Sequence, residues 1–351
     1  MNGYELSYVA LSSANPAGVA EVLGEDLGMC GGTVKGTGGA DVFTFAAGLS
    51  TICVFDCDHP LLDRAGTVGL DHIALATTDP EAAASRHSLS TLCSGVEQGI
   101  ADTRQVRVDP DQTAGVHVRF AEPITTPGNS GGVIERIDHL GVASLDVSSD
   151  EQVFVHTLGC PVESRQTDME ISLPVESFTS DKYGVVYHNR TPNPLGGLRV
   201  LFVSIGDCEL EFFQEFDPHQ DRRIEYGYAG TTKQDQGAIG RFVSKRGRGL
   251  HHIALKTPDI DSTLAYLTER GRATIDQVGR PGSRSARIGF LHHKALGGIL
   301  LHFVERIARG CIRQEFVQGG HFTCVHPGAD ILWQDGRHRQ LHGELHLWTF
   351  L

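Results

Sequence analysis

The chain contains no long apolar run, no excess of basic charge and no paired cysteine motif. None of its 351 residues lies in a stretch close to the roughly 20 apolar residues that span a bilayer, so we expect no membrane-spanning segment. The formal net charge is −13, from 30 basic and 43 acidic residues, which argues against a general nucleic-acid binder. A hydrophobic content of 40% is typical of a soluble globular protein.

The eight cysteines indicate no shared site, because they are scattered singly. Cys53 and Cys57 form the only close pair, and no second pair completes a zinc-binding motif. We therefore expect reduced and mostly buried thiols. The N-terminal segment has no basic region ahead of its short apolar run, so it does not resemble a secretory signal, and we expect a cytoplasmic protein.

What the chain does contain is a repeated phrase. A histidine follows one apolar and one polar residue and precedes alternating small and branched residues in GLDHIALATTDP (69–80), RIDHLGVASLDV (136–147) and GLHHIALKTPDI (249–260). Near the N-terminus, ELSYVALSSANP has the same pattern with a tyrosine in place of the histidine. The four anchor residues are Tyr8, His72, His139 and His252, spaced by 64, 67 and 113 residues.

Each anchor is followed by a helix-like segment and later by an alternating strand that closes the unit. The closing strands are STICVF with Cys53, GVHVRF with Arg119, CELEFF with Glu211 and GILLHF with His302. They lie 45, 47, 72 and 50 residues after their anchors, so the third unit carries an insertion, which we place within residues 160–195. Such a repeat predicts four β-α-β-β-β modules.

Strand alternation assigns the two faces of each anchor strand, because residues two apart share a side. His252 shares its side with Ala254, and His139 shares its side with Gly141. By the same rule, His251 is expected on the opposite face, where it has a structural role. A sheet that carries polar residues beside alanine and glycine on one face is expected to form a cavity there.

These features together resemble the vicinal oxygen chelate superfamily, in which paired β-α-β-β-β modules form a cupped sheet around a divalent metal. The blocks IDHLGVAS, LRVLFVSIGDCELEFFQ, RFVSKRGRGLHHIALKTPDI and FLHHKALGGILLHFVE are similar to successive blocks of methylmalonyl-CoA epimerases. Those enzymes usually contain one module pair. The doubled length resembles 4-hydroxyphenylpyruvate dioxygenases and the 2-epi-5-epi-valiolone epimerases of C7-cyclitol biosynthesis.

The resemblance implies an α+β fold of four modules in two pairs, each pair a cupped mixed sheet with helices outside. We assign residues 1–130 to an N-terminal module pair, 131–310 to a C-terminal pair with a metal site, and 311–351 to a C-terminal extension. The N-terminal pair is expected to be metal-free and structural, because an arginine and a tyrosine replace two ligands there. The extension is expected to cover the cup or to pack against a second subunit in a homodimer.

The family's ligands come from the anchor and the closing strand of each unit in a pair. Carried over to the C-terminal pair, they are His139, Glu211, His252 and His302. Because the family more often has a carboxylate at the last position, His302 is either a fourth ligand or an acid/base group beside the metal. A buried Glu211 would need a cation near it. The expected cofactor is a divalent metal, with zinc, manganese, nickel, cobalt and ferrous iron all compatible with this ligand set.

The activity implied is that of an isomerase. It is a metal-dependent epimerase that acts on a small carbonyl compound, at the carbon next to the carbonyl, through an enediolate. The first candidate substrate is 2-epi-5-epi-valiolone, which belongs to secondary metabolism. Glu209, two residues before Glu211 on the same side of its strand, and His302 are the candidate acid/base residues. Three alternatives stay open: methylmalonyl-CoA epimerase, an Fe(II) 4-hydroxyphenylpyruvate-type dioxygenase, and a non-catalytic small-molecule binding or resistance protein.

A group of basic residues flanks the fourth module. It would either receive a phosphate or CoA group or form a solvated edge. Its members are Lys245, Arg246, Arg248, Arg280, Arg284 and Arg287.

Overall fold

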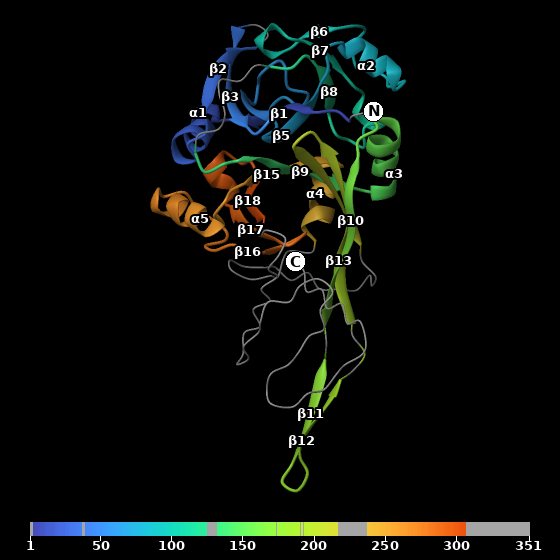
Figure 1. Ribbon diagram of the computed structural model, residues 1–351, viewed down its shortest axis with the longest axis vertical. Coiled ribbons are helices and arrows are strands. Elements are labelled where there is room, and N and C mark those ends of the chain that lie inside the picture. Colours follow the sequence, from blue (N-terminus) through green and yellow to red (C-terminus); the bar gives the residue numbers. More distant parts are fainter. Residues whose placement is uncertain are drawn as a thin grey trace.

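Two eight-stranded mixed sheets form the body of the protein, and helices lie on their outer sides (Figure 1). The computed structural model describes residues 3–36, 39–124, 132–172, 174–189, 191, 193–216 and 237–306. The two sheets confirm the predicted α+β fold with two pairs of modules. The predicted extension, 311–351, lies outside the described residues. No helix in the described ranges has the length and apolar character needed to cross a membrane.

The N-terminal sheet has the strand order β2-β3-β4-β1-β5-β8-β7-β6. Its first module contains β1 (Leu6–Ser13), α1 (Pro16–Glu21), a π-helical turn (Val22–Asp26), β2 (Gly31–Lys35), β3 (Asp41–Ala47) and β4 (Ser50–Asp56). Its second module contains β5 (Gly69–Ala76), α2 (Pro80–Arg86), β6 (Glu97–Gln98), β7 (Arg104–Arg107), β8 (Val118–Ala121) and two 3₁₀ turns (Ile100–Asp102 and Pro110–Gln112).

The C-terminal sheet repeats this order as β10-β13-β14-β9-β15-β18-β17-β16. The third module contains β9 (Arg136–Ser144), α3 (Val147–Glu151), a π-helical turn (Gln152–Thr157), β10 (Val162–Ser172), β13 (Asn193–Ile205) and β14 (Cys208–Phe216). The connecting helix α4 (Ala238–Arg246) leads to the fourth module, with β15 (Gly249–Lys256), α5 (Ile260–Glu269), β16 (Arg280–Gly282), β17 (Ala286–Leu291), a 3₁₀ turn (His293–Leu296) and β18 (Leu301–Arg306).

The strand register shows how closely the four modules repeat. In each module the closing strand runs parallel to the anchor strand, and its distinctive residue pairs with the residue two positions after the anchor. These pairs are Ala10 with Cys53, Ala74 with Arg119, Gly141 with Glu211 and Ala254 with His302. Because residues two apart on a strand share a face, the anchor and closing residues of every module meet on the same side of the sheet.

The predicted insertion in the third module is a two-stranded arm. Strands β11 (Val175–Ser180) and β12 (Gly184–Asn189) pair only with each other, beyond the far ends of β10 and β13. Figure 1 shows this ribbon projecting away from both sheets. The surplus length therefore leaves the sheet order unchanged.

Each module helix starts at a side-chain cap directly after its anchor strand. Asn15, Asp79, Asp146 and Asp259 each accept a hydrogen bond from a backbone N–H in the first turn of the following helix. Such caps satisfy N–H groups that have no partner within the helix. The repeated cap fixes where every helix leaves its sheet.

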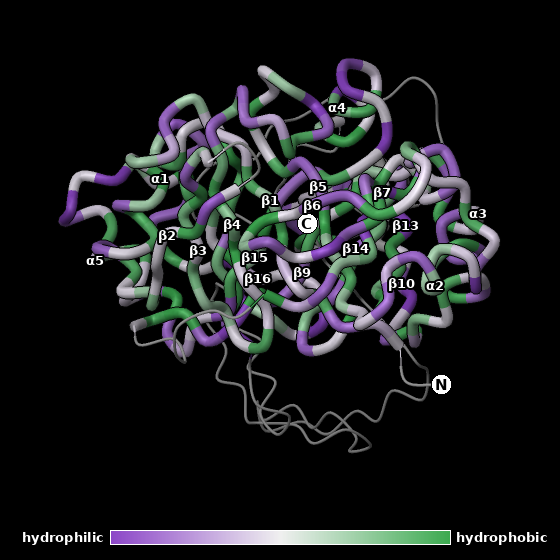
Figure 2. Tube along the Cα trace, turned by 90° about the horizontal axis from the view of Figure 1, so that it is seen from above, coloured by the Kyte–Doolittle hydropathy of each residue, from purple (hydrophilic) through white to green (hydrophobic). Residues whose placement is uncertain are grey.

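One large hydrophobic cluster spans both halves, and smaller clusters lie beside it. Val9 and Ile73 of the N-terminal sheet belong to the same buried cluster as Leu140 and Ile253 of the C-terminal sheet. In Figure 2 apolar segments follow the strands of both sheets, while several loops at the rim are hydrophilic. The two halves are therefore held together by apolar packing, which frees the inner face of each sheet for polar residues.

A substitution at Phe154 tests the packing of this core. It is fully buried, with its ring centroid 4.8 Å from that of Phe212. We expect Phe154→Ala to lower the free energy of unfolding by about 3–5 kcal/mol, because it leaves a cavity. Phe178→Ala, on the arm where the side chain is 58% exposed, should change it by less than about 0.5 kcal/mol. Denaturant unfolding measures both, and equal losses would contradict the packing described.

Candidate metal centre

Four side chains, one from each of the strands β9, β14, β15 and β18 of the C-terminal sheet, meet at one point. The Nε2 atom of His139 lies 3.1 Å from a carboxylate oxygen of Glu211, 3.2 Å from Nε2 of His302 and 3.5 Å from Nε2 of His252. Nε2 of His252 is 3.6 Å from the same Glu211 oxygen. The sequence-predicted set is thus brought together. The three histidines are 5–6% exposed, so the group is almost closed to solvent.

The spacing of these atoms suits a small cation. Ligand atoms around a tetrahedral metal ion, at metal–nitrogen distances of about 2.0–2.1 Å, lie roughly 3.3 Å apart. The four measured separations, from 3.1 to 3.6 Å, bracket this value. The three histidines alone offer ligand atoms within 4.8 Å of one another. The donor set therefore fits a divalent metal.

The pKa values of these groups are also shifted by burial and by one another. Burial alone would raise the pKa of the Glu211 carboxyl, but the charge and the hydrogen bond of His139 hold it below its usual value. Burial disfavours protonation of His139, yet Glu211 and Asp138 outweigh it and raise the pKa of His139 to about 9. Burial, and then the charge of His302, push the pKa of His252 well below its usual range. Glu211 and His139 thus favour each other's charged forms.

Two β-bulges aim further side chains at this group. Between β9 and β15 the register slips at Asp138 and again at His251, so each of these residues is an extra one in its strand. Nδ1 of His139 lies 2.8 Å from Asp138, and Nδ1 of His252 lies 3.0 Å from Nδ1 of His251. Strict alternation, which puts His251 on the far face, is wrong here because a bulge turns the side chain. The sequence reasoning also missed Asp138.

Small residues leave room for the imidazoles, as the strand pattern predicted. A Cβ atom on Gly141 would lie 2.1 Å from Cε1 of His252, closer than atoms can approach. Phe213 stacks on the ring of His252, and Phe290 meets the ring of His302 edge-on. The ligand rings are therefore positioned by packing as well as by hydrogen bonds.

Glu209 lies beside the four-residue group. It pairs in register with His139 and shares its strand face with Glu211. Its carboxylate forms an ion pair with Arg284, with 2.7 Å between Oε2 and Nη2. Arg284 also donates to Glu163, and its guanidinium carbon sits 3.4 Å above the ring of Phe202. Glu209 is thus held at the edge of the metal centre.

The equivalent residues of the N-terminal sheet also converge, with a different outcome. The hydroxyl of Tyr8 lies 3.3 Å from Nε2 of His72, while Arg119 is buried and donates to Gln105 and Asp63. Burial raises the pKa of Tyr8 to about 12, and burial with the charge of Arg119 lowers the pKa of His72 to about 4. The fixed positive charge of Arg119 occupies this interior and pairs with Asp63, which together with Asp71 and His72 forms a second group of potential ligand atoms. The structural, metal-free role of this half stays a prediction.

The flanking basic residues do not form one patch. Arg246 and Arg248 donate to backbone carbonyls of the N-terminal half, and Arg287 pairs with Asp261 and Glu305. Arg280 and Arg284 point instead toward acidic partners inside the C-terminal sheet. The structure therefore gives no single phosphate-binding surface from these residues.

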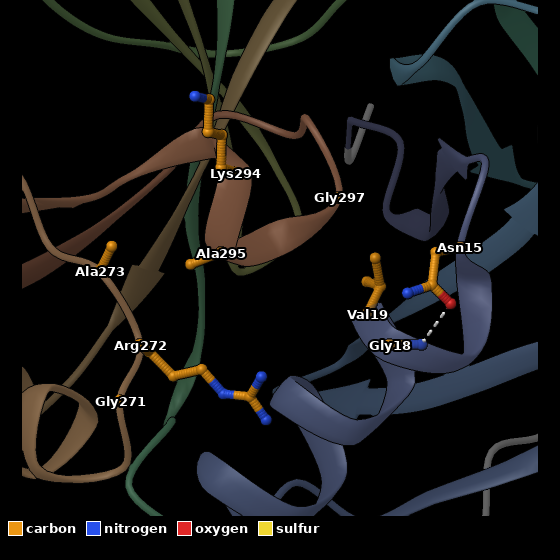
Figure 3. Close-up of a pocket in the computed structure, with 9 residues that line it drawn as sticks. All are labelled: Asn15, Gly18, Val19, Gly271, Arg272, Ala273, Lys294, Ala295 and Gly297. Atoms are coloured by element: carbon orange, nitrogen blue, oxygen red, sulfur yellow. Dashed lines mark hydrogen bonds between the residues drawn. The ribbon is translucent and has the colours of Figure 1, made fainter.

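A cavity of about 380 Å³ lies elsewhere, between α1 and the segments around Arg272 and Lys294 (Figure 3). The guanidinium of Arg272 is engaged by Asp26 and Glu21. This cavity shares no residue with the histidine group and adds nothing to the candidate site.

Comparison with known proteins finds similarity mainly in the C-terminal half. The model of the glyoxalase/bleomycin resistance protein/dioxygenase superfamily matches residues 138–290. The mitochondrial methylmalonyl-CoA epimerase of Bos taurus is 20% identical over 213 residues, 58% of this chain and 98% of that protein. The uncharacterized protein YqjC of Bacillus subtilis is 26% identical over 172 residues, 49% of this chain and 93% of that protein.

A solved structure extends the likeness to both halves. A mutant of 4-hydroxymandelate synthase from Streptomyces coelicolor has a TM-score of 0.58 with 15% identity, covering 87% of this chain and 93% of that one. At this identity the likeness shows the fold alone. The 4-hydroxymandelate synthase structure therefore has the same paired arrangement of two curled sheets.

His139 and His72 provide a matched test of the site, because each is a buried anchor histidine next to an aspartate. We expect His139→Gln to reduce the bound divalent metal to less than about a tenth of the native stoichiometry, since a ligand is lost. His72→Gln should leave the stoichiometry unchanged. Elemental analysis of the purified variants measures both. Equal metal content in the two variants would contradict the assignment.

Proposed function

We propose that this protein is a divalent-metal-dependent epimerase, a proposal supported by the match of residues 138–290 to the model of the glyoxalase/bleomycin resistance protein/dioxygenase superfamily. It acts on the carbon next to a carbonyl group of a small molecule. The observation that carries the proposal is the meeting of His139, Glu211, His252 and His302 at ligand spacing in a nearly closed site. Zinc, manganese, nickel, cobalt and ferrous iron all suit this set.

The four side chains hold the metal, and a bound divalent ion supplies Lewis-acid polarisation of the substrate carbonyl, which makes the neighbouring C–H bond more acidic. The bulge residue Asp138 orients the ring of His139 by accepting from Nδ1, which directs Nε2 toward the metal position. Asp138 is itself fully buried and held by Arg306 and Arg136. The ligand geometry is thus supported by a second layer of hydrogen bonds.

Glu209 is the proposed proton acceptor. Its carboxylate lies on the same strand face as Glu211, and the ion pair with Arg284 fixes its position. His302 is the second acid/base candidate, because its Nδ1 is buried and has no hydrogen-bond partner among the described residues. Nε2 of His302 lies 3.2 Å from Nε2 of His139, at ligand spacing. If His302 binds the metal through Nε2, inversion would need another acid on the face of the enediolate opposite Glu209.

The proposal has two leading candidate substrates. 2-Epi-5-epi-valiolone is the substrate implied by the resemblance of the doubled chain, with its epimerase-like second half, to the epimerases of C7-cyclitol biosynthesis. Methylmalonyl-CoA is favoured by the relatives, because the Bos taurus protein that matches 58% of the chain is a methylmalonyl-CoA epimerase. A ferrous dioxygenase is a further candidate, favoured by the likeness in fold to 4-hydroxymandelate synthase across both halves.

The proposal also includes the organisation expected from the sequence. Residues 1–130 form a structural, metal-free pair, 131–310 form the catalytic pair, and the protein acts as a homodimer in the cytoplasm. The apolar arm supports self-association, since Phe178 and Tyr187 are 58% and 70% exposed. Sedimentation equilibrium of the purified protein tests the dimer.

The reaction class is tested by incubating the metal-loaded protein with each candidate substrate in deuterium oxide. We expect metal-dependent incorporation of deuterium next to the carbonyl, without consumption of oxygen. Oxygen uptake coupled to substrate loss would favour the dioxygenase instead. A protein that binds substrate with neither exchange nor oxygen uptake would favour the non-catalytic binder.

Glu209→Gln tests the proton acceptor. We expect it to slow deuterium exchange by about 10²-fold or more, because the amide cannot accept the proton, while metal content stays native. Glu163→Gln is the matched control, since Glu163 is the other carboxylate that pairs with Arg284. That control should retain exchange within about threefold of the native rate, as expected for a partly exposed ion pair. Similar rates for both variants would remove Glu209 from the proposed role.

A further inference from the structure

Arg280 is a buried arginine on the inner face of the C-terminal sheet. It starts the edge strand β16 and pairs in register with Ile288 of β17, so the two side chains lie on the same face. Ile288 packs with Ala254 and Val304. These two residues are two positions after His252 and His302, and therefore share their faces. Arg280 thus points into the same interior as the metal centre.

One aromatic ring separates the guanidinium of Arg280 from His302. Its guanidinium carbon lies 5.4 Å from the ring centroid of Phe290, and that centroid lies 4.6 Å from the ring of His302. A single aromatic ring therefore lies between the positive charge of Arg280 and the metal centre.

The guanidinium is only partly satisfied. Its Nε donates to Asp276 at 3.1 Å, and the other oxygen of Asp276 accepts the backbone N–H of Phe290 at 2.9 Å. Asp276 thereby holds Arg280 in place. The side chain is only 9% exposed. Its Nη1 is buried and has no hydrogen-bond partner within the described part of the chain. A buried N–H group without an acceptor is unfavourable, so a partner from outside would be stabilised there.

From this geometry we infer that Nη1 of Arg280 binds a carboxylate group of the substrate while the substrate carbonyl lies at the metal centre. The inference rests on the proposed function, since it needs a substrate bound at the metal. A carboxylate accepts a charge-assisted hydrogen bond, which is stronger than one to a neutral oxygen. A divalent ion with three neutral imidazoles and one carboxylate keeps one net positive charge, which also attracts an anion.

A carboxylate fits better than a phosphate. The buried nitrogen of Arg280 that lacks an acceptor is Nη1, because Nε is taken by Asp276. A phosphate group carries a charge of about −1.5 to −2 and recruits several donors. The substrate class is therefore a carbonyl compound that carries a carboxylate close to the reacting carbon. Methylmalonyl-CoA has such a group, whereas 2-epi-5-epi-valiolone is neutral, so Arg280 favours the first over the second.

The test measures equilibrium binding by calorimetry and uses no turnover. The probes are 2-oxo diacids of four to six carbons, each compared with the 2-oxo monoacid of the same length. Both kinds can bind the metal through the 2-oxo acid end, and only the diacid has a second carboxylate for Arg280. We expect the best diacid to bind the metal-loaded native protein about tenfold or more tightly than its monoacid, as for a hydrogen bond between charged groups.

Arg280→Gln should abolish this preference and leave monoacid affinity unchanged, and Arg280→Lys should keep part of it, because the charge is retained. Arg287→Gln is the matched control on the neighbouring strand, since Arg287 pairs with Asp261 and Glu305 outside the interior. It should keep the native preference. Thermal unfolding and metal content, measured for every variant, verify that the site is intact.

The outcomes separate the two claims. Equal affinity for diacids and monoacids in the metal-loaded native protein, or an undiminished preference in a folded, metal-loaded Arg280→Gln variant, overturns the role of Arg280 alone. A native protein that takes up no metal, and binds neither probe, overturns the proposed function.

Discussion

A buried carboxylate among three imidazoles is the constraint on which the C-terminal half depends. Glu211 is 14% exposed and has His139 and His252 within 3.1 and 3.6 Å. Such a carboxylate needs a positive charge beside it. Either a proton on His139 or a metal ion can supply this charge. The metal suits the site better, because the Nε2 atoms of three imidazoles face one another at ligand spacing, where a metal ion can bind all of them. The bulges at Asp138 and His251 and the missing side chain of Gly141 all serve this arrangement.

The two halves share one fold but carry different residues on the inner faces of their sheets. Both have an aspartate that contacts the Nδ1 atom of an anchor histidine, as in Asp71 with His72 and Asp138 with His139. In the N-terminal half, the interior is filled by Arg119 and by Leu61 and Leu62, which pack against Tyr8 and Cys53. In the C-terminal half the equivalent positions hold the four proposed metal ligands, His139, Glu211, His252 and His302. The fold therefore does not decide the chemistry, and the residues at four equivalent positions do.

Much of this was predictable, because the repeat determines both topology and register. The spacing of Tyr8, His72, His139 and His252 predicted four modules, and the closing strands predicted which residues meet them. Strand alternation then failed at His251, since a bulge inserts one residue and turns its side chain, and the bulge at Asp138 was not anticipated. The recurrence of an aspartate before His72 and His139 was the available signal for that contact. Arg280 could not be singled out, because its burial and its unpaired nitrogen depend on the fold around Asp276 and Phe290.

The ligand set at the metal is the central claim, and X-ray absorption spectroscopy of the zinc-loaded protein tests it most directly. We expect three imidazole nitrogens and one carboxylate oxygen at about 2.0–2.1 Å from the ion, with any further ligand an oxygen from solvent. A zinc ion bound by cysteine sulfur, or by fewer than two imidazoles, would contradict the convergence of His139, His252 and His302 on one cation.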